Sequence, residues 1–213
     1  MTKPKDRIRE AAKKLFSQNG YDTVSLRMIA EEAGTTIGNL TYHYRRKEDL
    51  IAAIQKKSQA DFMAGLDPIP QDPRDITRHL SLMAKKSQKG HDENPFYFRN
   101  MIELCGNFTS IRENTADFRA KVYHEHLKCF DRLRTSGHMR VDIPIRNYSN
   151  LAYIIVILVT IWTQNASSYD DHNLPRPSLE DSLRGLVFPY LTPAGRKLFQ
   201  EMDCPGFPEN SPV

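Results

Sequence analysis

Five small or polar residues lie close together between positions 35 and 41: Thr35, Thr36, Gly38, Asn39 and Thr41. The leading end of a helix that enters the major groove of DNA carries such side chains, because its free backbone N–H groups face phosphate there. The Asn39 amide suits the edge of an adenine, and Thr41 suits a base or a thymine methyl group. The pattern therefore predicts sequence-specific contact with DNA.

Three further side chains follow this cluster and suit the phosphate backbone. They are the phenol of Tyr42, the imidazole of His43 and the ammonium of Lys47. Such groups hold a duplex in place without reading its sequence. For Tyr42 and His43, packing inside the protein is the alternative role.

Ile37, Ser25 and Arg27 complete the predicted set of DNA-contacting residues. Ile37 is a large aliphatic residue in the first turn of an exposed helix, so it needs either a thymine methyl group or a protein neighbour. Ser25 and Arg27 lie at the start of the preceding helix. Ser25 and Thr36 are also good N-caps, and capping alone is the alternative role for both.

Histidines and cysteines near position 126 raise the question of a metal or redox site. His126 and Cys129 share a helical face, but His124 points elsewhere and the sequence holds no second cluster of ligands. We therefore expect no metal ion and no other cofactor. The cysteines are widely spaced, so reduced thiols are expected. A thiol switch at Cys105 or Cys129 would need a lowered thiol pKa.

The residues that would contact DNA lie on two predicted short helices. The first spans about residues 26–33, and Gly34 ends it at a position that favours a positive φ. The second spans about residues 37–44. Two short helices joined by a tight turn form a helix-turn-helix, which we place at about residues 25–44.

Helical periodicity continues through the rest of the chain, and no useful length alternates with a period of two. The sequence therefore predicts an all-α protein. Besides the helix-turn-helix, we expect a first helix that ends at Asn19 and helices over residues 48–62, 75–89, 96–107, 115–136, 145–168, 179–190 and 193–202.

Composition and charge favour a globular protein with a basic N-terminal part. Hydrophobic residues make up 39% of the 213, which is too many for a disordered chain. Residues 1–57 carry 12 lysines and arginines against 7 acidic residues, whereas the remainder carries 18 against 19. A basic excess at one end is typical of a module that faces a polyanion. An ordinary solvated helix surface is the alternative explanation.

The sequence has no segment suited to crossing a membrane. Its central uncharged stretch, residues 151–164, covers about two-thirds of the roughly 20 residues that a bilayer requires. No apolar run follows the basic start of the chain. We therefore expect a buried helix over this stretch, no membrane partner and a cytoplasmic location.

Residues 20–50 resemble the DNA-binding domain of the tetracycline-repressor (TetR) family. The shared features are Gly20-Tyr21, the Ile29-Ala-x-x-Ala-Gly34 turn, Gly38-x-Leu40, His43-Tyr44 and Lys47-Glu-x-Leu50. The resemblance covers about residues 6–55. It implies that the helix over residues 37–44 is the recognition helix, and it supports DNA roles for the residues named above, while Leu40 and Tyr44 are expected in the core.

The sequence departs from the family pattern at four positions. Thr41 stands where Tyr is usual, Ile37 where Lys is frequent, Tyr44 where Phe dominates and Arg46 where a small cap residue is common. The first two departures predict an unusual operator.

Residues 94–104, 137–140 and 188–195 are similar to one branch of the family's regulatory domains. The resemblance implies a helical domain that dimerises through its last two long helices and encloses a small-molecule pocket. An intramolecular core without dimerisation is the alternative. Candidate pocket residues, for which plain core packing is the alternative, are Met101, Cys105, Phe108, Tyr123, Phe130, Trp162 and Asn165.

The sequence thus predicts a three-helix DNA-binding domain over residues 1–48, a helical ligand-binding and dimerisation domain over 49–203, and a mobile tail over 204–213. The expected function is a ligand-responsive homodimeric repressor of a palindromic operator. Its expected partners are operator DNA, a second copy of the chain and an unknown small-molecule effector. Catalytic motifs such as Gly-x-Ser-x-Gly and His-Glu-x-x-His are absent, so we do not expect an enzyme. The alternative is a helical small-molecule carrier or protein-interaction adaptor that does not bind DNA.

Overall fold

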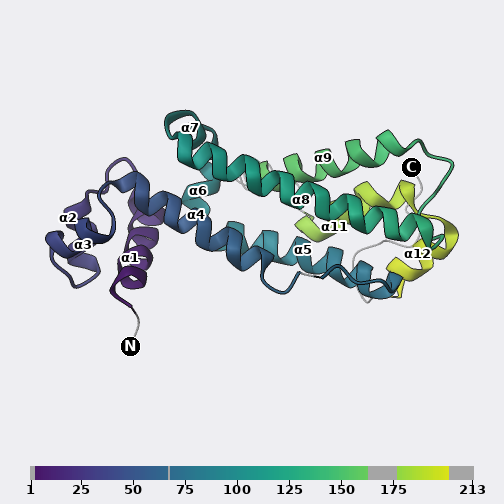
Figure 1. The fold of residues 1–213 in the computed structure, drawn as a ribbon, viewed down its shortest axis with the longest axis horizontal. Coiled ribbons are helices and arrows are strands. Elements are labelled where there is room, and N and C mark those ends of the chain that lie inside the picture. Colours follow the sequence, from purple (N-terminus) through teal and green to yellow (C-terminus); the bar gives the residue numbers. More distant parts are fainter. Residues whose placement is uncertain (1–2, 67, 163–176, 202–213) are drawn as a thin grey trace. The chain divides into compact units, whose positions relative to one another are not determined.

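The computed structural model describes residues 3–66, 68–162 and 177–201, which are almost entirely helical (Figure 1). Within these ranges the only β-type pairing is an isolated antiparallel bridge between Met139 and Leu191. The predicted all-α class is therefore confirmed. In chain order the elements are α1 (Pro4–Asn19), α2 (Leu26–Glu32), α3 (Ile37–His43), α4 (Lys47–Met63), α5 (Pro73–Glu93), α6 (Pro95–Arg99), α7 (Met101–Asn107), α8 (Thr109–Thr135), α9 (Ile145–Ile161), α11 (Leu179–Val187), the 3₁₀ helix η1 (Phe188–Tyr190) and α12 (Pro193–Gln200).

By packing, the chain divides into two compact units. The first comprises Met1–Met63 and Gly90–Phe118, and the second comprises Ala64–Lys89 and Arg119–Val213. Helices α5 and α8 therefore contribute residues to both units. Residues 90–118 pack with the predicted DNA-binding helices although they lie far from them in the sequence. The functional boundary after residue 48 stays a prediction, and the predicted tail over residues 204–213 lies outside the described residues.

Helices α1, α2 and α3 begin and end where their local chemistry requires. Gly20 follows α1 with a φ of 79°, and its N–H donates to the Phe16 carbonyl at 3.1 Å. Ser25 caps α2 by accepting a hydrogen bond from the Met28 N–H at 3.3 Å. Thr36 caps α3 in the same way. Both predicted N-caps are confirmed, so each satisfies an otherwise free helical N–H.

One apolar core holds the helix-turn-helix on α1 and α4. Ile8 of α1, Ile29 of α2, Leu40 of α3 and Leu50 of α4 are fully buried in it. Tyr44 is buried in the same core, so the predicted core positions of Leu40 and Tyr44 are confirmed. Because α3 is only seven residues long, this tertiary packing and not helix propensity must supply most of its stability.

Residues 90–118 extend that core and tie α4 to α6 and α8. Gln55 of α4 is buried, and its amide nitrogen lies 2.8 Å from both Tyr97 Oη and Thr115 Oγ1 and 3.1 Å from the Ile111 carbonyl oxygen. A buried amide is stable only when it is hydrogen-bonded in this way. The hydrogen bonds fix the position of α4 within its unit.

The predicted helix over residues 96–107 is wrong in one respect, because it breaks at Asn100 into α6 and α7. The Asn100 side chain donates to the Phe96 carbonyl at 2.7 Å. Such a bond competes with continued helix formation. Helix α8 also begins at Thr109, earlier than expected, and the predicted end of the helix over 145–168 lies outside the described residues.

The second unit packs α5, α8, α9, α11 and α12 around a separate core. Ile76, Phe130, Tyr148 and Ile155 are among its fully buried members. The connection after α8 meets α12 so closely that a Cβ on Gly195 would lie 2.0 Å from the His138 carbonyl oxygen. Within the three described ranges, no helix has both the length and the apolar character needed to cross a bilayer.

Candidate nucleic-acid interface

Helix α3 turns its first residues outward and its middle inward. Thr36, Ile37 and Gly38 are exposed, whereas Leu40 is completely buried beneath them. Ile37 keeps 47% of its surface accessible, so neighbours within the described chain cover only about half of it. The exposed first turn therefore satisfies the requirement that a recognition helix present its N-terminal end to DNA.

Two polar side chains of α3 are held in place by short-range hydrogen bonds. The Asn39 amide nitrogen donates to Thr35 Oγ1 at 2.7 Å. The Thr41 hydroxyl lies 3.0 Å from the Ile37 carbonyl oxygen and 3.1 Å from that of Gly38. These bonds set the direction of each side chain before any ligand arrives.

The backbone of α3 has no side chain covering it at Gly38. A Cβ built there would meet a single neighbour within 4 Å, the Thr36 hydroxyl oxygen at 4.0 Å. The fold itself therefore does not need a glycine at this helical position. A glycine that packing does not require is consistent with close approach of another molecule to the backbone.

Among the large hydrophobic side chains that the structure describes, Tyr42 is the most exposed, with 83% of its surface accessible. Its ring contacts the half-buried His43 ring edge-to-face, with 5.1 Å between centroids. Packing in the core, the alternative role for Tyr42, is thus excluded in this structure. The phenol is free to reach a neighbouring phosphate.

Lys47 is bound more tightly to the protein than its sequence position indicates. Its ammonium donates to the main-chain carbonyls of Tyr21, Asp22 and Val24, at 3.1 Å for the latter two. These bonds connect the start of α4 to the turn between α1 and α2. Because an ammonium has three donors, a phosphate contact would require Lys47 to exchange one of these carbonyls.

The remaining predicted contacts lie at the start of α2, and one further candidate was missed. Ser25 serves as a cap, and Arg27 is exposed, with its Nε 3.4 Å from Glu31 Oε1. Arg45, between α3 and α4, is exposed and has no ion-pair partner among the described residues. Its neighbour Arg46 pairs instead with Glu48 at 3.1 Å. The run Arg45-Arg46-Lys47 was the signal that could have identified it.

The candidate pocket residues that the structure describes belong to different units of the chain. Met101 belongs to the core of the first unit, and Cys105 and Phe108 pack against that core. In the second unit Phe130 and Tyr123 line two different cavities. Trp162 is half-buried just after α9, and Asn165 lies outside the described residues. A shared pocket for these residues therefore stays a prediction, and residue type alone does not distinguish the two cores in which Met101 and Phe130 lie.

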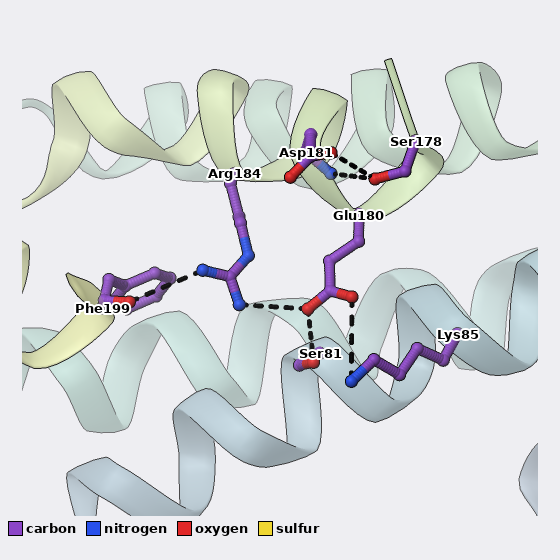
Figure 2. Close-up of polar contacts among 7 residues, drawn as sticks. All are labelled: Ser81, Lys85, Ser178, Glu180, Asp181, Arg184 and Phe199. Atoms are coloured by element: carbon purple, nitrogen blue, oxygen red, sulfur yellow. Dashed lines mark hydrogen bonds and ion pairs between the residues drawn. The ribbon is translucent and has the colours of Figure 1, made fainter. Parts of the chain in front are cut away.

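Two cavities lined by described residues of the second unit differ in size and chemistry. One, of about 450 Å³, opens between α8 and α9 and is lined by Tyr123, Tyr153 and Ile157 among others. The other, of about 40 Å³, is bordered by α5, α8, α9, α11 and α12. We call it the Arg184 cavity. Arg184 and Glu180, both drawn in Figure 2, line it. The sequence did not identify either residue as a pocket candidate, because both are charged residues that interrupt the apolar stripe of α11.

The histidine and cysteine near the Arg184 cavity are both uncharged at neutral pH. Burial lowers the pKa of His126 to about 4, and burial raises the pKa of the Cys129 thiol to about 12. Such a thiol is a poor nucleophile. Across the described ranges, no three histidine, cysteine or acidic side chains are grouped so that they could hold a metal ion.

Comparison with known proteins assigns both parts of the chain to the same class. Residues 8–54 match the family described as bacterial regulatory proteins, tetR family, and residues 59–199 match the TetR family described as bacterial transcriptional repressors. The repressor AcnR of Corynebacterium diphtheriae is 25% identical over 187 residues, which cover 83% of this chain and 90% of AcnR.

Two solved structures share the fold. A TetR-family regulator from Marinobacter aquaeolei VT8 superposes with a TM-score of 0.78 at 22% identity, covering 94% of this chain and 97% of that one. SmeT in complex with triclosan superposes with a TM-score of 0.69 at 19% identity and covers 99% of both chains.

Proposed function

Since the chain belongs to the tetR family of bacterial regulatory proteins, and its relative AcnR is a transcriptional repressor, we propose that it is a ligand-responsive homodimeric repressor and not an enzyme. In this proposal α3 docks in the major groove of a palindromic operator. The observation that carries it is the exposed first turn of α3. The buried side chain of Leu40 holds this helix on the core, and no side chain covers the backbone at Gly38. The expected place of action is the cytoplasm, where bacterial operator DNA lies.

We assign the DNA contacts by chemistry and exposure. Asn39 and Thr41 read base edges, Ile37 contacts a thymine methyl group, and Tyr42 and His43 bind phosphate. Thr35, Thr36 and Gly38 line the same approach. Ser25, Arg27 and Lys47 border it, and Arg45 is added because it is exposed beside them.

A second copy of the chain is proposed to cover α9. Tyr153, Ile154 and Ile157 expose 60%, 49% and 41% of their surfaces on this helix. Neighbouring apolar side chains on a surface commonly mark a protein interface. Dimerisation would place two α3 helices on half-sites about 34–36 Å apart or a multiple of that distance, which compensates for the weak binding of one short helix.

The ligand response is proposed because the second unit has cavities and SmeT, which shares the fold, is solved with triclosan. A ligand changes operator binding only if it prefers one conformation of the repressor over the other. Reciprocity requires operator DNA to weaken ligand binding by the same factor. Helix α8, which contributes to both units, is the proposed connection.

The proposal is tested by selecting genomic fragments with the purified protein at about 0.15 M salt, together with sedimentation of the free protein. Recovery of one palindrome and a dimeric mass would support it. Absence of any salt-dependent duplex binding would reject it in favour of a carrier or adaptor.

The Asn39→Ala variant then tests base reading on the recovered operator. We expect it to weaken operator binding by about 1–3 kcal/mol while leaving random duplex nearly unchanged. Equal loss on both duplexes would show that Asn39 does not read bases.

A further inference from the structure

The side chain of Asn39 is bonded to the turn that precedes its own helix. Its amide nitrogen donates to Thr35 Oγ1 at 2.7 Å, while its backbone N–H donates to the N-cap hydroxyl of Thr36 at 3.2 Å. In a capping box, the side chain of the third helical residue returns to the N-cap N–H. The Asn39 side chain reaches the hydroxyl one residue earlier instead, so its bond to Thr35 is additional to ordinary capping.

Thr35 is itself held by the end of α2. Its backbone N–H donates to the Ala30 carbonyl at 2.9 Å, across a turn in which Gly34 has a φ of 60°. Threonine is β-branched, so its side chain has little freedom about χ1. The turn therefore determines where Thr35 Oγ1 lies, and the hydrogen bond transmits that position to the Asn39 amide.

The bond to Thr35 leaves the Asn39 amide with one donor and one acceptor. An amide nitrogen has two N–H donors, and one of them is committed to Thr35 Oγ1. Within the described part of the chain, this is the only hydrogen bond that the Asn39 side chain makes. The second N–H and the carbonyl oxygen Oδ1 are thus available to a base.

Adenine matches this remaining pair of groups on its major-groove edge. It presents N7, an acceptor, beside the N6 amino group, which is a donor. Guanine presents two acceptors, N7 and O6, at the same places. With the amide held by Thr35, Oδ1 would face guanine O6, and two acceptors enclosed together without a donor cost free energy. The held amide therefore accepts adenine and rejects guanine.

We propose that Thr35 is a positioning residue that makes Asn39 selective for adenine over guanine. Thr35 touches no base; its hydroxyl holds the amide in the orientation that directs one donor and one acceptor into the groove. Without this hydroxyl the amide turns about its last side-chain bond and offers both N–H groups to guanine. The inference rests on the proposed DNA-binding function and names what one of its contacts recognises.

The test selects binding sites from randomised duplexes with the full-length protein at about 0.15 M salt. Selection with the parent and with Asn39→Ala identifies the base pair that Asn39 reads, because the preference at that pair is lost in the variant. At that pair we expect the parent to favour adenine over guanine by about 5- to 150-fold, the range of one bidentate contact.

Thr35→Val replaces the hydroxyl by a methyl group of similar size. We expect the preference for adenine at the pair read by Asn39 to fall to about 3-fold or less. Preferences at other pairs and the affinity for random duplex should not change. Thr35→Ser keeps the hydroxyl and should keep the preference. The matched control is Thr23→Val, which removes a hydroxyl bonded to the Asn19 carbonyl and should leave every preference unchanged.

Two further measurements show whether Thr35 acts through Asn39. In the Asn39→Ala background, Thr35→Val should alter no preference further, because a residue that acts through another has no effect once the other is removed. In the free protein, nitrogen NMR relaxation of the Asn39 side-chain amide should show a rigid group in the parent and in Thr35→Ser, and a mobile group in Thr35→Val.

Several results would overturn the inference. One is a parent without preference for adenine at the pair read by Asn39, and another is a Thr35→Val protein that keeps the preference. An equal loss of affinity for every duplex in Thr35→Val would place Thr35 itself on phosphate. An additional effect in the Asn39→Ala background, or an amide that stays rigid without the hydroxyl, would also contradict it.

Failure of this inference is distinguishable from failure of the proposed function. In each case above the parent still binds duplex DNA, so only the role of Thr35 is rejected. A parent that binds no duplex at any salt concentration would reject both. If Thr35→Val does not fold, Thr35→Ala removes the same hydroxyl and is judged by the same criteria.

Discussion

Replacing Gly38 by alanine separates the needs of the fold from those of DNA binding. Gly38 lies within α3, and the added Cβ would meet only the Thr36 hydroxyl oxygen, at 4.0 Å. Alanine restricts the unfolded chain and suits a helix better, so Gly38→Ala should raise the free energy of unfolding by about 0.5–1 kcal/mol. If α3 lies against DNA, the same methyl group enters a packed interface and should weaken operator binding by about 1–3 kcal/mol.

The assay combines urea unfolding with fluorescence anisotropy of a labelled operator duplex. The control is Gly106→Ala in α7, where no described atom lies within 4 Å of the added Cβ. Both variants should be at least as stable as the parent, but only Gly38→Ala should lose affinity, by about 5-fold or more. A Gly38→Ala protein that binds operator as tightly as the parent would refute close approach of α3 to DNA.

Three further predictions test other parts of the structure. Lys47→Ala removes an ammonium that binds three carbonyls, so the free energy of unfolding should fall by about 1–3 kcal/mol. The slope of duplex affinity against salt concentration should also fall by about one unit. An unchanged slope would show that Lys47 stabilises the fold but does not bind phosphate. Gly195→Ala forces a methyl group onto the His138 carbonyl oxygen and should destabilise the protein by about 1–3 kcal/mol in urea unfolding, and unaltered stability would contradict this close contact. Between pH 7 and pH 4 the free energy of unfolding of the parent should fall by roughly 3 kcal/mol through His126. The pKa of His126 is about 4 in the folded protein and near 6.5 in the unfolded chain, so the unfolded chain binds the proton first as the pH falls. His126→Leu should remove this loss, whereas the same change at the exposed His124 should not; equal pH profiles for the two variants would disprove it.

Much of the proposed DNA-binding surface was predictable because its determinants are local. Ser25 and Thr36 are N-cap residues and indicate where α2 and α3 begin, and the spacing of apolar residues predicts that Leu40 is buried. Each of these signals acts within a few residues along the chain. The sequence also favoured exposed roles for Ile37 and Tyr42, and their side chains are exposed.

The partners of the charged side chains were not predictable in the same way. Lys47 was expected to be available for phosphate, yet it bonds to carbonyls 23 to 26 residues earlier in the chain. The break at Asn100 was also missed, because a side chain competing for a backbone carbonyl leaves helical periodicity unchanged.

By itself, the sequence determined the helical class, the helix-turn-helix and the family, since these depend on periodicity, capping residues and a local motif. Only the tertiary structure decided which distant segments share a core. It packed residues 90–118 with the helix-turn-helix and assigned Met101 and Phe130 to different cores. It also brought Ser81 and Lys85 to Glu180, about 100 positions later in the chain. Periodicity reports which face of a helix is buried but not against what, because contacts between distant helices depend on packing and not on spacing along the chain.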